Sequence, residues 1–94
     1  MTASKNDKLL RKIEAARFDY GLSVSGMVKV LDTTRESYYS WRNGVTMHPS
    51  TSERVSGRLM QLHKLKIDIN TLGWMSLTAK QRERKVLAAI RKAK

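Results

Sequence analysis

The sequence has no cysteine and one proline among its 94 residues. Without thiols there is neither a disulfide framework nor a thiolate metal site, and a reducing cytoplasm suits the chain. The sequence has no run of about 18 apolar residues and no secretory signal, so we expect no membrane span and no export. Period-two alternation of apolar residues is missing too, which disfavours strands. What is left is one small domain built from helices.

Acidic residues are also scarce. Eight Asp and Glu stand against 19 Lys and Arg, which gives a net charge of +11. An excess of this size is typical of a protein with a polyanionic partner, with nucleic acid ahead of a membrane surface. The alternative is a chain that is basic only for its own solubility. Residues 78–94 hold seven basic side chains and one acidic, more than half of the excess.

Residues that can cap a helix precede apolar stripes with helical spacing along the whole chain. The expected caps are Ser4 or Asn6, Ser23, Thr34, Ser50, Asn70 and Thr78. The expected inward residues are Leu9, Ile13, Ala16, Tyr20, Val24, Met27, Val28, Leu31, Tyr38, Trp41, Val55, Leu59, Leu62, Val86, Ile90 and Ala93. Gly21 and Asn43-Gly44 should end the first and third helices. We therefore predict an all-α fold, a compact bundle of five to six short helices.

One segment carries a family resemblance, 22-LSVSGMVKVLDTTRESYYSWRNG-44 together with the proline that follows it. The matching residues, which need no gap, are Leu22, Ser23, Leu31, Thr34, Trp41, Asn43, Gly44 and Pro49. This pattern resembles the helix-turn-helix of the lambda-repressor/Cro class, also called the xenobiotic-response-element class, found in phage and plasmid regulators. Residues 67-IDINTLGW-74 are similar to the short last helix of that domain, so the resemblance covers roughly residues 8 to 75.

Four positions depart from the family pattern. Val28 stands where the family has a small residue, Asp32 where it has glycine, and Tyr38 where it has Ile or Val. Asp32 can take the left-handed corner conformation, although less readily than glycine or asparagine. Val24 replaces a Gln that often touches DNA in the family. Recognition is therefore expected to depend on the third helix, or on another part of the chain.

The resemblance implies that the third helix lies in the major groove of DNA. The residues then expected to read bases are Arg35, Glu36, Tyr39 and Ser40. Those expected at the DNA backbone are Ser23, Ser37, Arg42, Asn43, Thr46 and His48. Arg35 can pair with guanine and Glu36 can accept from cytosine. Glu36 can instead serve the helix dipole, and Tyr39 can instead be a half-buried packing residue.

The resemblance divides the chain into a helix-turn-helix DNA-binding domain, residues 1–77, and a basic C-terminal helix, residues 78–94. We expect this last helix to form a dimer contact, to touch the DNA backbone, or both; the alternative is a frayed tail. The residues assigned to it are Val86, Leu87, Ile90, Lys80, Arg84 and Lys85.

The predicted function is a sequence-specific transcriptional regulator in the cytoplasm, associated with the nucleoid. The expected form is a homodimeric repressor on an inverted repeat of double-stranded DNA. An antitoxin with a toxin partner and an activator that touches polymerase are alternatives. A protein of another class, bound to RNA or acidic membrane through the last helix, stays open. We expect no enzyme, no cofactor and no metal site, since His48 and His63 lack ligand spacing.

Overall fold

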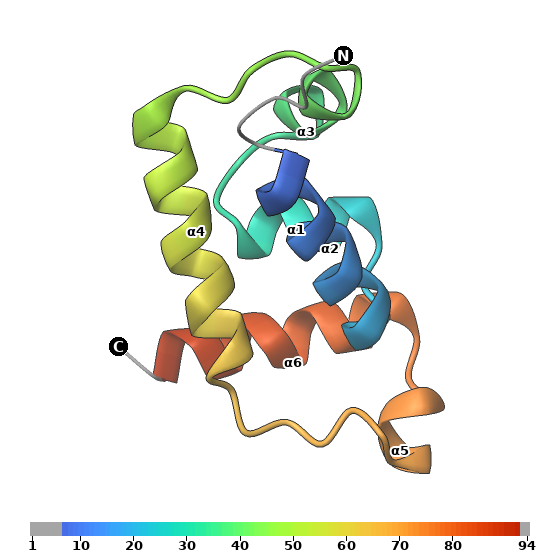
Figure 1. The fold of residues 1–94 in the computed structure, drawn as a ribbon. Helices are drawn as coiled ribbons and strands as arrows, with labels where there is room; N and C mark the ends of the chain where they lie inside the picture. Colours follow the sequence, from blue (N-terminus) through green and yellow to red (C-terminus); the bar gives the residue numbers. More distant parts are fainter. Residues whose placement is uncertain (1–6, 93–94) are drawn as a thin grey trace.

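A computed structural model describes residues 7–92, and within that range every regular element is a helix (Figure 1). The helices are α1 (Asp7–Tyr20), α2 (Val24–Val30), α3 (Arg35–Arg42), α4 (Pro49–His63), α5 (Leu72–Met75) and α6 (Ala79–Lys92). The prediction of an all-α bundle of five to six short helices is confirmed. The predicted caps Ser4 and Asn6, and the inward residue Ala93, lie outside the described residues.

Three of the predicted caps hold the starts of α2, α3 and α6. The hydroxyls of Ser23 and Thr34 each accept a hydrogen bond from the backbone N–H three residues on, at 3.0 and 3.1 Å. At α6 the exchange is reciprocal. The N–H of Gln81 donates to Oγ1 of Thr78 at 3.1 Å, and the N–H of Thr78 donates to Oε1 of Gln81 at 2.9 Å. These bonds satisfy N–H groups that have no partner inside the helix.

The starts of α4 and α5 differ from the prediction by a residue or two. α4 begins at Pro49, and the Nδ1 of His48 accepts the N–H of Ser50 at 3.2 Å, so His48 is the cap. Proline fits the first helical position because the N–H it lacks would be unpaired there. α5 is capped by Thr71 and not by Asn70: Oγ1 of Thr71 accepts the N–H three residues on, at 3.2 Å.

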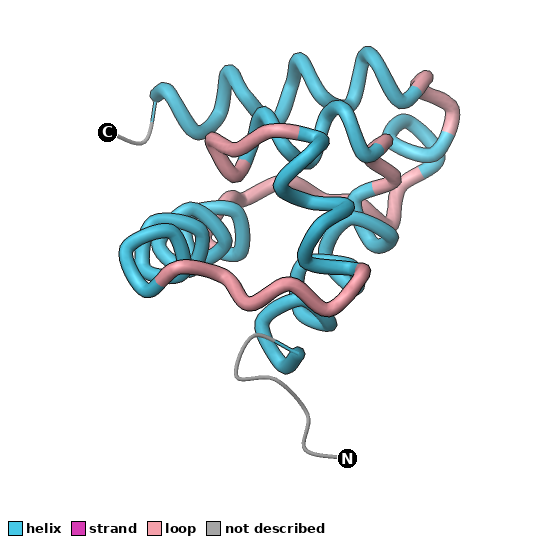
Figure 2. The backbone as a smooth tube through the Cα atoms, turned by 90° about the horizontal axis from the view of Figure 1, so that it is seen from above, coloured by secondary structure: helices cyan, strands magenta, loops and turns pink. Residues whose placement is uncertain are grey.

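The turn between α2 and α3 requires a left-handed residue, and Asp32 provides it. Its φ is 57°, the one positive value of a non-glycine residue in the described range. A short polar side chain tolerates this conformation better than most, so the corner forms without the glycine typical of the family pattern. Gly21 and Gly44, with φ of 67° and 94°, end α1 and α3 as predicted. Figure 2 shows short loops between most helices and longer ones on either side of α4.

The core draws on every helix. All the predicted inward residues that are described are buried, except Leu9 and Val24, which are partly buried. The buried apolar side chains that were not predicted are Leu22, Val30, Met47 and Trp74, and Gly26 and Glu83 are buried as well. Two hydrogen bonds tie distant segments together inside the core. The Tyr20 hydroxyl donates to the carbonyl of Leu62 at 3.0 Å, and Nε1 of Trp74 donates to the carbonyl of Tyr20 at 3.0 Å.

α6 packs into this same core. Val86 and Ile90 are buried, and the helix lies along α2 and against the end of α4. Gly26 of α2 faces Glu83 of α6 so closely that a methyl group at Gly26 would lie 3.0 Å from a carboxylate oxygen. In Figure 1, α3 lies at the top of the molecule and α6 crosses its lower part above α5, with α2 between α3 and α6. α6 is thus part of the globule formed by α1 to α5.

Candidate nucleic-acid interface

α3 presents two faces of opposite character. Tyr38 is fully buried and Trp41 is 6% exposed, as predicted. Successive residues of a helix are rotated by about 100°, so the side chains opposite this pair point into solvent. Arg35, Glu36 and Tyr39 occupy that outward face, and all three are exposed. The burial of two aromatic rings therefore fixes which side of α3 a partner can touch.

The base-reading candidates differ in how far their side chains are exposed to solvent. Arg35 and Glu36 are exposed in the first turn of α3, whereas Ser40 is half-buried. Tyr39 is 40% exposed and lies edge-on to Tyr38, with ring centroids 6.2 Å apart and an interplanar angle of 87°. Both interpretations of Tyr39 thus have support, because the ring packs along one edge and is open on the rest.

The backbone candidates follow α3 or start a helix. Asn43 caps the C-terminal end of α3, and Thr46 is exposed in the loop that follows. His48 is exposed and caps α4, and Ser23 is exposed and caps α2. Ser37 is half-buried, and its Oγ accepts a hydrogen bond from Thr34 at 3.0 Å. Three of these side chains therefore already form hydrogen bonds within the chain: Ser23, Ser37 and His48.

A charged cluster that the sequence analysis missed joins α1 to the end of α3. Nε of Arg17 donates to Glu14 at 2.8 Å, and Nε of Arg42 lies 3.5 Å from the other carboxylate oxygen. Partial burial acts to raise the pKa of Glu14, but the hydrogen bond from Arg17 and the charge of Arg42 lower it overall. The guanidinium of Arg42 also lies 6.0 Å from the Tyr39 ring centroid. Arg42 is therefore held beside the outward face of α3.

The Tyr38 hydroxyl lies beneath this cluster. Burial, reinforced by the nearby Glu14 carboxylate, raises the pKa of Tyr38 to about 12. Within the described part of the chain this buried oxygen has no hydrogen bond of good geometry, although Glu14 lies close enough for hydrogen bonding to contribute to the raised pKa of Tyr38. Buried hydroxyls are usually bonded, so a hydroxyl whose one neighbouring acceptor is poorly placed contributes little to the stability of the fold.

Two arginines that the sequence analysis did not single out are structural. Nε of Arg58 donates to the carbonyl of Val30 at 2.9 Å, at the C-terminal end of α2. The guanidinium of Arg82 donates to the carbonyls of Gly21 at 3.1 Å and Met75 at 2.8 Å, and also to that of Trp74. These contacts join segments up to 61 residues apart. Part of the positive charge therefore stabilises the fold and is not free for a partner.

The residues assigned to the last helix separate into two groups. Val86 and Ile90 lie in the chain's own core, and Leu87 is half-buried, although the sequence suggested a dimer contact for all three. Side chains buried inside one copy have no surface to offer a second copy. Lys80, Arg84 and Lys85 are exposed, as a phosphate contact requires, and they lie on the opposite side of α6 from the buried pair.

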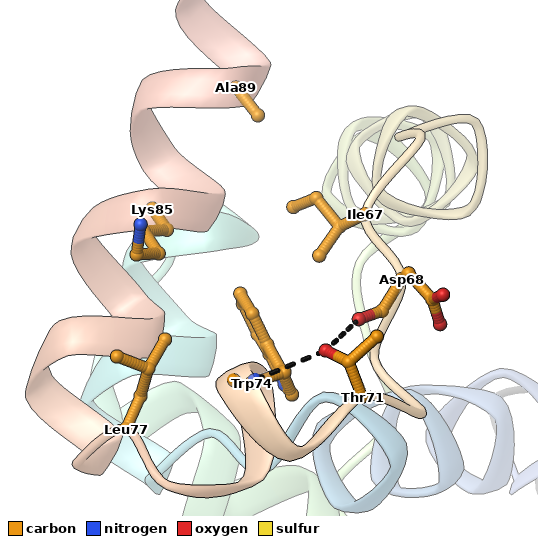
Figure 3. Close-up of a pocket in the computed structure, with 8 residues that line it drawn as sticks. Ile67, Asp68, Thr71, Trp74, Leu77, Lys85 and Ala89 are labelled. Atoms are coloured by element: carbon orange, nitrogen blue, oxygen red, sulfur yellow. Dashed lines mark hydrogen bonds between the residues drawn. The ribbon is translucent and has the colours of Figure 1, made fainter.

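A groove of about 480 Å³ opens between α6 and the segment that leads into α5 (Figure 3). Its apolar and charged lining residues include Ile67, Trp74, Leu77, Ala89, Asp68 and Lys85. In Figure 3 the Trp74 ring stands between the two walls, next to Thr71. Beside the groove, Leu72 and Met75 of α5 are 84% and 62% exposed. Apolar surface is therefore exposed beside α6.

Comparison with known proteins adds no family to this picture. A scan against protein-family models, a search of curated proteins and a search of solved structures each found no match to the chain. Among residues 7–92 no helix is long and apolar enough to cross a membrane. The candidate site is therefore interpreted from its own geometry.

Proposed function

We propose that the chain is a sequence-specific DNA-binding transcriptional regulator. In this proposal α2, its turn at Asp32 and α3 form a helix-turn-helix, with α3 in the major groove. The observation that carries the proposal is the division of α3 into a buried aromatic face and an exposed face with Arg35, Glu36 and Tyr39. The net charge of +11 supports a polyanionic partner.

The exposed charged residues of α3 each have a chemical role in this proposal. Arg35, in the first turn, can donate two hydrogen bonds to O6 and N7 of guanine, and Glu36 can accept from N4 of cytosine. Arg42, Asn43 and Thr46 follow at the end of α3 and in the next loop, where they can hold phosphates. Base contacts then set the sequence and phosphate contacts set the position.

We further propose that two copies bind an inverted repeat as a repressor in the nucleoid, because one α3 reads only a half-site. The exposed Leu72 and Met75 of α5 are the apolar surface that a second copy can cover. These two residues replace Val86 and Ile90 as the candidate dimer contact, because Val86 and Ile90 are buried within one copy.

Selection of bound duplexes from a random DNA pool tests the function directly. The expected result is an enriched motif made of two symmetric half-sites, each with a guanine that footprinting shows to be protected. A single asymmetric site would contradict the proposed dimer but would still agree with the proposed function as a DNA-binding regulator. No enrichment by a folded protein would overturn the proposed function.

Arg35→Ala is expected to reduce affinity for the selected duplex by about 5- to 150-fold, because a bidentate pair to guanine contributes about 1–3 kcal/mol of discrimination. Affinity for random duplex should change much less. Lys66→Ala, which removes an exposed lysine distant in sequence from α3, is the matched control. Titration of both variants on both duplexes decides the role: an equal loss on the two would make Arg35 a phosphate contact.

A further inference from the structure

The outer face of α6, defined by Lys80, Arg84, Lys85, Arg91 and Lys92, is exposed along its whole length. At about 100° per residue these five side chains fall within an arc of about 140°. Gln81 and Ala88 are the other exposed residues of α6 between them, and both are uncharged. Every charged side chain in the arc is therefore a cation, on a helix of 14 residues.

The single carboxylate of α6 is withdrawn from this face. Glu83 is 4% exposed, and Nζ of Lys29 from α2 donates to its Oε2 at 3.1 Å. Nζ of Lys80 lies 3.9 Å from the same oxygen, with the Lys80 side chain still 63% exposed. Because Glu83 is buried and paired, it does not repel an anion that approaches the outer face.

The outer face points away from α2 and α4, and its Lys85 also lines the groove beside α5, with Asp68 on the opposite wall. Glu83, Val86 and Ile90 mark the opposite side of α6, which lies against α2 and α4. In Figure 1, α3 lies on the other side of α2 from α6. A rigid duplex whose major groove holds α3 therefore has its backbone on a different side from the one that α6 presents.

We propose that the outer face of α6 binds the phosphate backbone of a second duplex segment, without sequence preference, while α3 reads the first. The inference rests on the proposed function for the first duplex only. One chain would then bridge two DNA segments. Each phosphate neutralised on the second segment contributes about 0.9 to the dependence of log affinity on log salt, so binding there should weaken steeply as salt rises.

An acidic membrane is the other polyanion that a basic helix can meet, but α6 lacks the surface for it. Helices that lie on a bilayer bury an apolar face among the acyl chains. The apolar residues Val86 and Ile90 are 0% and 2% exposed within the core. Only the small side chain of Ala88 interrupts the polar outer face. A phosphate backbone requires no apolar insertion, which favours nucleic acid.

A two-step capture experiment tests the proposal with the full chain. The duplex selected from the random pool is immobilised, the protein is bound, and a labelled random duplex is then added at about 0.1 M salt. The test variant combines Arg84→Gln, Lys85→Gln, Arg91→Gln and Lys92→Gln, and it leaves Lys80 beside Glu83. The control variant removes the same charge from four other exposed lysines, as Lys8→Gln, Lys12→Gln, Lys64→Gln and Lys66→Gln.

The wild type and the control variant should both capture the labelled duplex, and the test variant should capture at least about tenfold less while it keeps its affinity for the immobilised one. If the protein does not bind the immobilised duplex, the proposed function of α3 is contradicted, and this failure is distinct from a failure of the α6 proposal. Equal capture by the test variant, or no capture by the wild type, overturns the bridging proposal. So does a test variant whose affinity and salt dependence on the immobilised duplex both fall, which would place α6 on the same segment. Wild-type sedimentation with phosphatidylserine vesicles, without competition from duplex, would assign the face to membranes.

Discussion

At the residue scale, Tyr38 and Trp41 are the side chains that orient α3. Both rings face the core, with centroids 6.4 Å apart, and their burial leaves Arg35 and Glu36 in solvent. Arg42 is held beside them by Glu14 of α1. The position of the outward face thus depends on packing behind it as much as on the residues that it carries.

Trp41→Ala should lower the free energy of unfolding by about 3–5 kcal/mol, the usual cost of removing a large buried aromatic side chain. Small domains have only about 5–15 kcal/mol in total, so the variant should lose a large part of its stability. Urea titration followed by circular dichroism measures the change. Tyr39→Ala, an exposed aromatic in the same helix, should cost under about 1 kcal/mol. Unchanged stability of Trp41→Ala with loss of DNA binding would show that the indole faces the partner.

Tyr38→Phe should leave the stability at neutral pH unchanged or raise it, because the lost hydroxyl is buried without a hydrogen bond of good geometry. An unfolded tyrosine ionises near pH 10, whereas the folded Tyr38 keeps its proton up to about pH 12. Between these values the unfolded state binds fewer protons, so the stability of the wild type falls as the pH rises. The contribution of Tyr38 to the free energy of unfolding is therefore fully present below about pH 10 and is lost as the pH rises to about 12.

Urea titrations of the wild type and the Tyr38→Phe variant at pH 8 to 12 measure how the stability of each changes with pH. Lysine ionisation is common to the two, so the difference between them isolates residue 38. The Phe variant should lose less stability over the alkaline range. An equal loss in both proteins would mean that the Tyr38 ring is more open to solvent than its burial indicates.

At the scale of the elements, the contact between α2 and α6 is set by Gly26. A Cβ there would lie 3.0 Å from Oε1 and 3.3 Å from Cγ of Glu83, closer than side chains normally pack. Glu83 is buried and bonded to Lys29, so it has little room to move. The two helices therefore approach more closely than a larger residue in α2 would permit.

Gly26→Ala should destabilise the fold although alanine favours helix over glycine by about 1 kcal/mol. Gly57→Ala in α4 is the matched control, because nothing lies within 4 Å of its added methyl group. The control should therefore raise the free energy of unfolding by up to about 1 kcal/mol. Thermal melting of the two variants gives the comparison, and a rise of similar size in both would show that α6 shifts away without cost.

At the scale of the whole molecule, α6 serves both the core and the surface. Its inner side contributes Val86 and Ile90 to the core, and Arg82 bonds carbonyls of the α1–α2 turn and of α5. Its outer face carries the cations of the second proposed surface. The sequence separates residues 78–94 by charge, whereas the packing makes α6 continuous with the helices before it.

Deletion of residues 78–94 should unfold the chain or nearly so, because it removes two buried side chains at about 1.5–3 kcal/mol each and leaves Gly26 and Val28 uncovered. Far-ultraviolet circular dichroism and melting of the truncated protein measure the loss. The charge-removing variant of the outer face, which keeps the full chain, should melt like the wild type. A truncated chain that melts at the wild-type temperature would show that α1 to α5 form a complete domain.

The local interactions of this chain were determined by the sequence itself. The caps Ser23, Thr34 and Thr78 act over three residues, and the stripe that buries Tyr38 and Trp41 follows from the turn of one helix. Interactions of this range depend on residue type and spacing alone. The outward face of α3 could therefore be predicted, including the exposure of Arg35 and Glu36. The caps of α4 and α5 were misplaced because a neighbouring side chain, His48 or Thr71, caps each helix instead, and residue type alone did not choose between neighbours.

Only the tertiary structure decided which distant residues meet. Glu83 pairs with Lys29 across 54 residues, Arg82 reaches Gly21 across 61, and Arg42 lies beside Glu14 of α1. A spacing pattern shows that a stripe will be buried but not what will cover it, because helices distant in sequence pack by shape and volume. The stripe of α6 was for this reason assigned to a dimer, although α2 and α4 of the same chain bury it. Packing likewise decided that the outer face of α6 lies on the far side of α2 from α3.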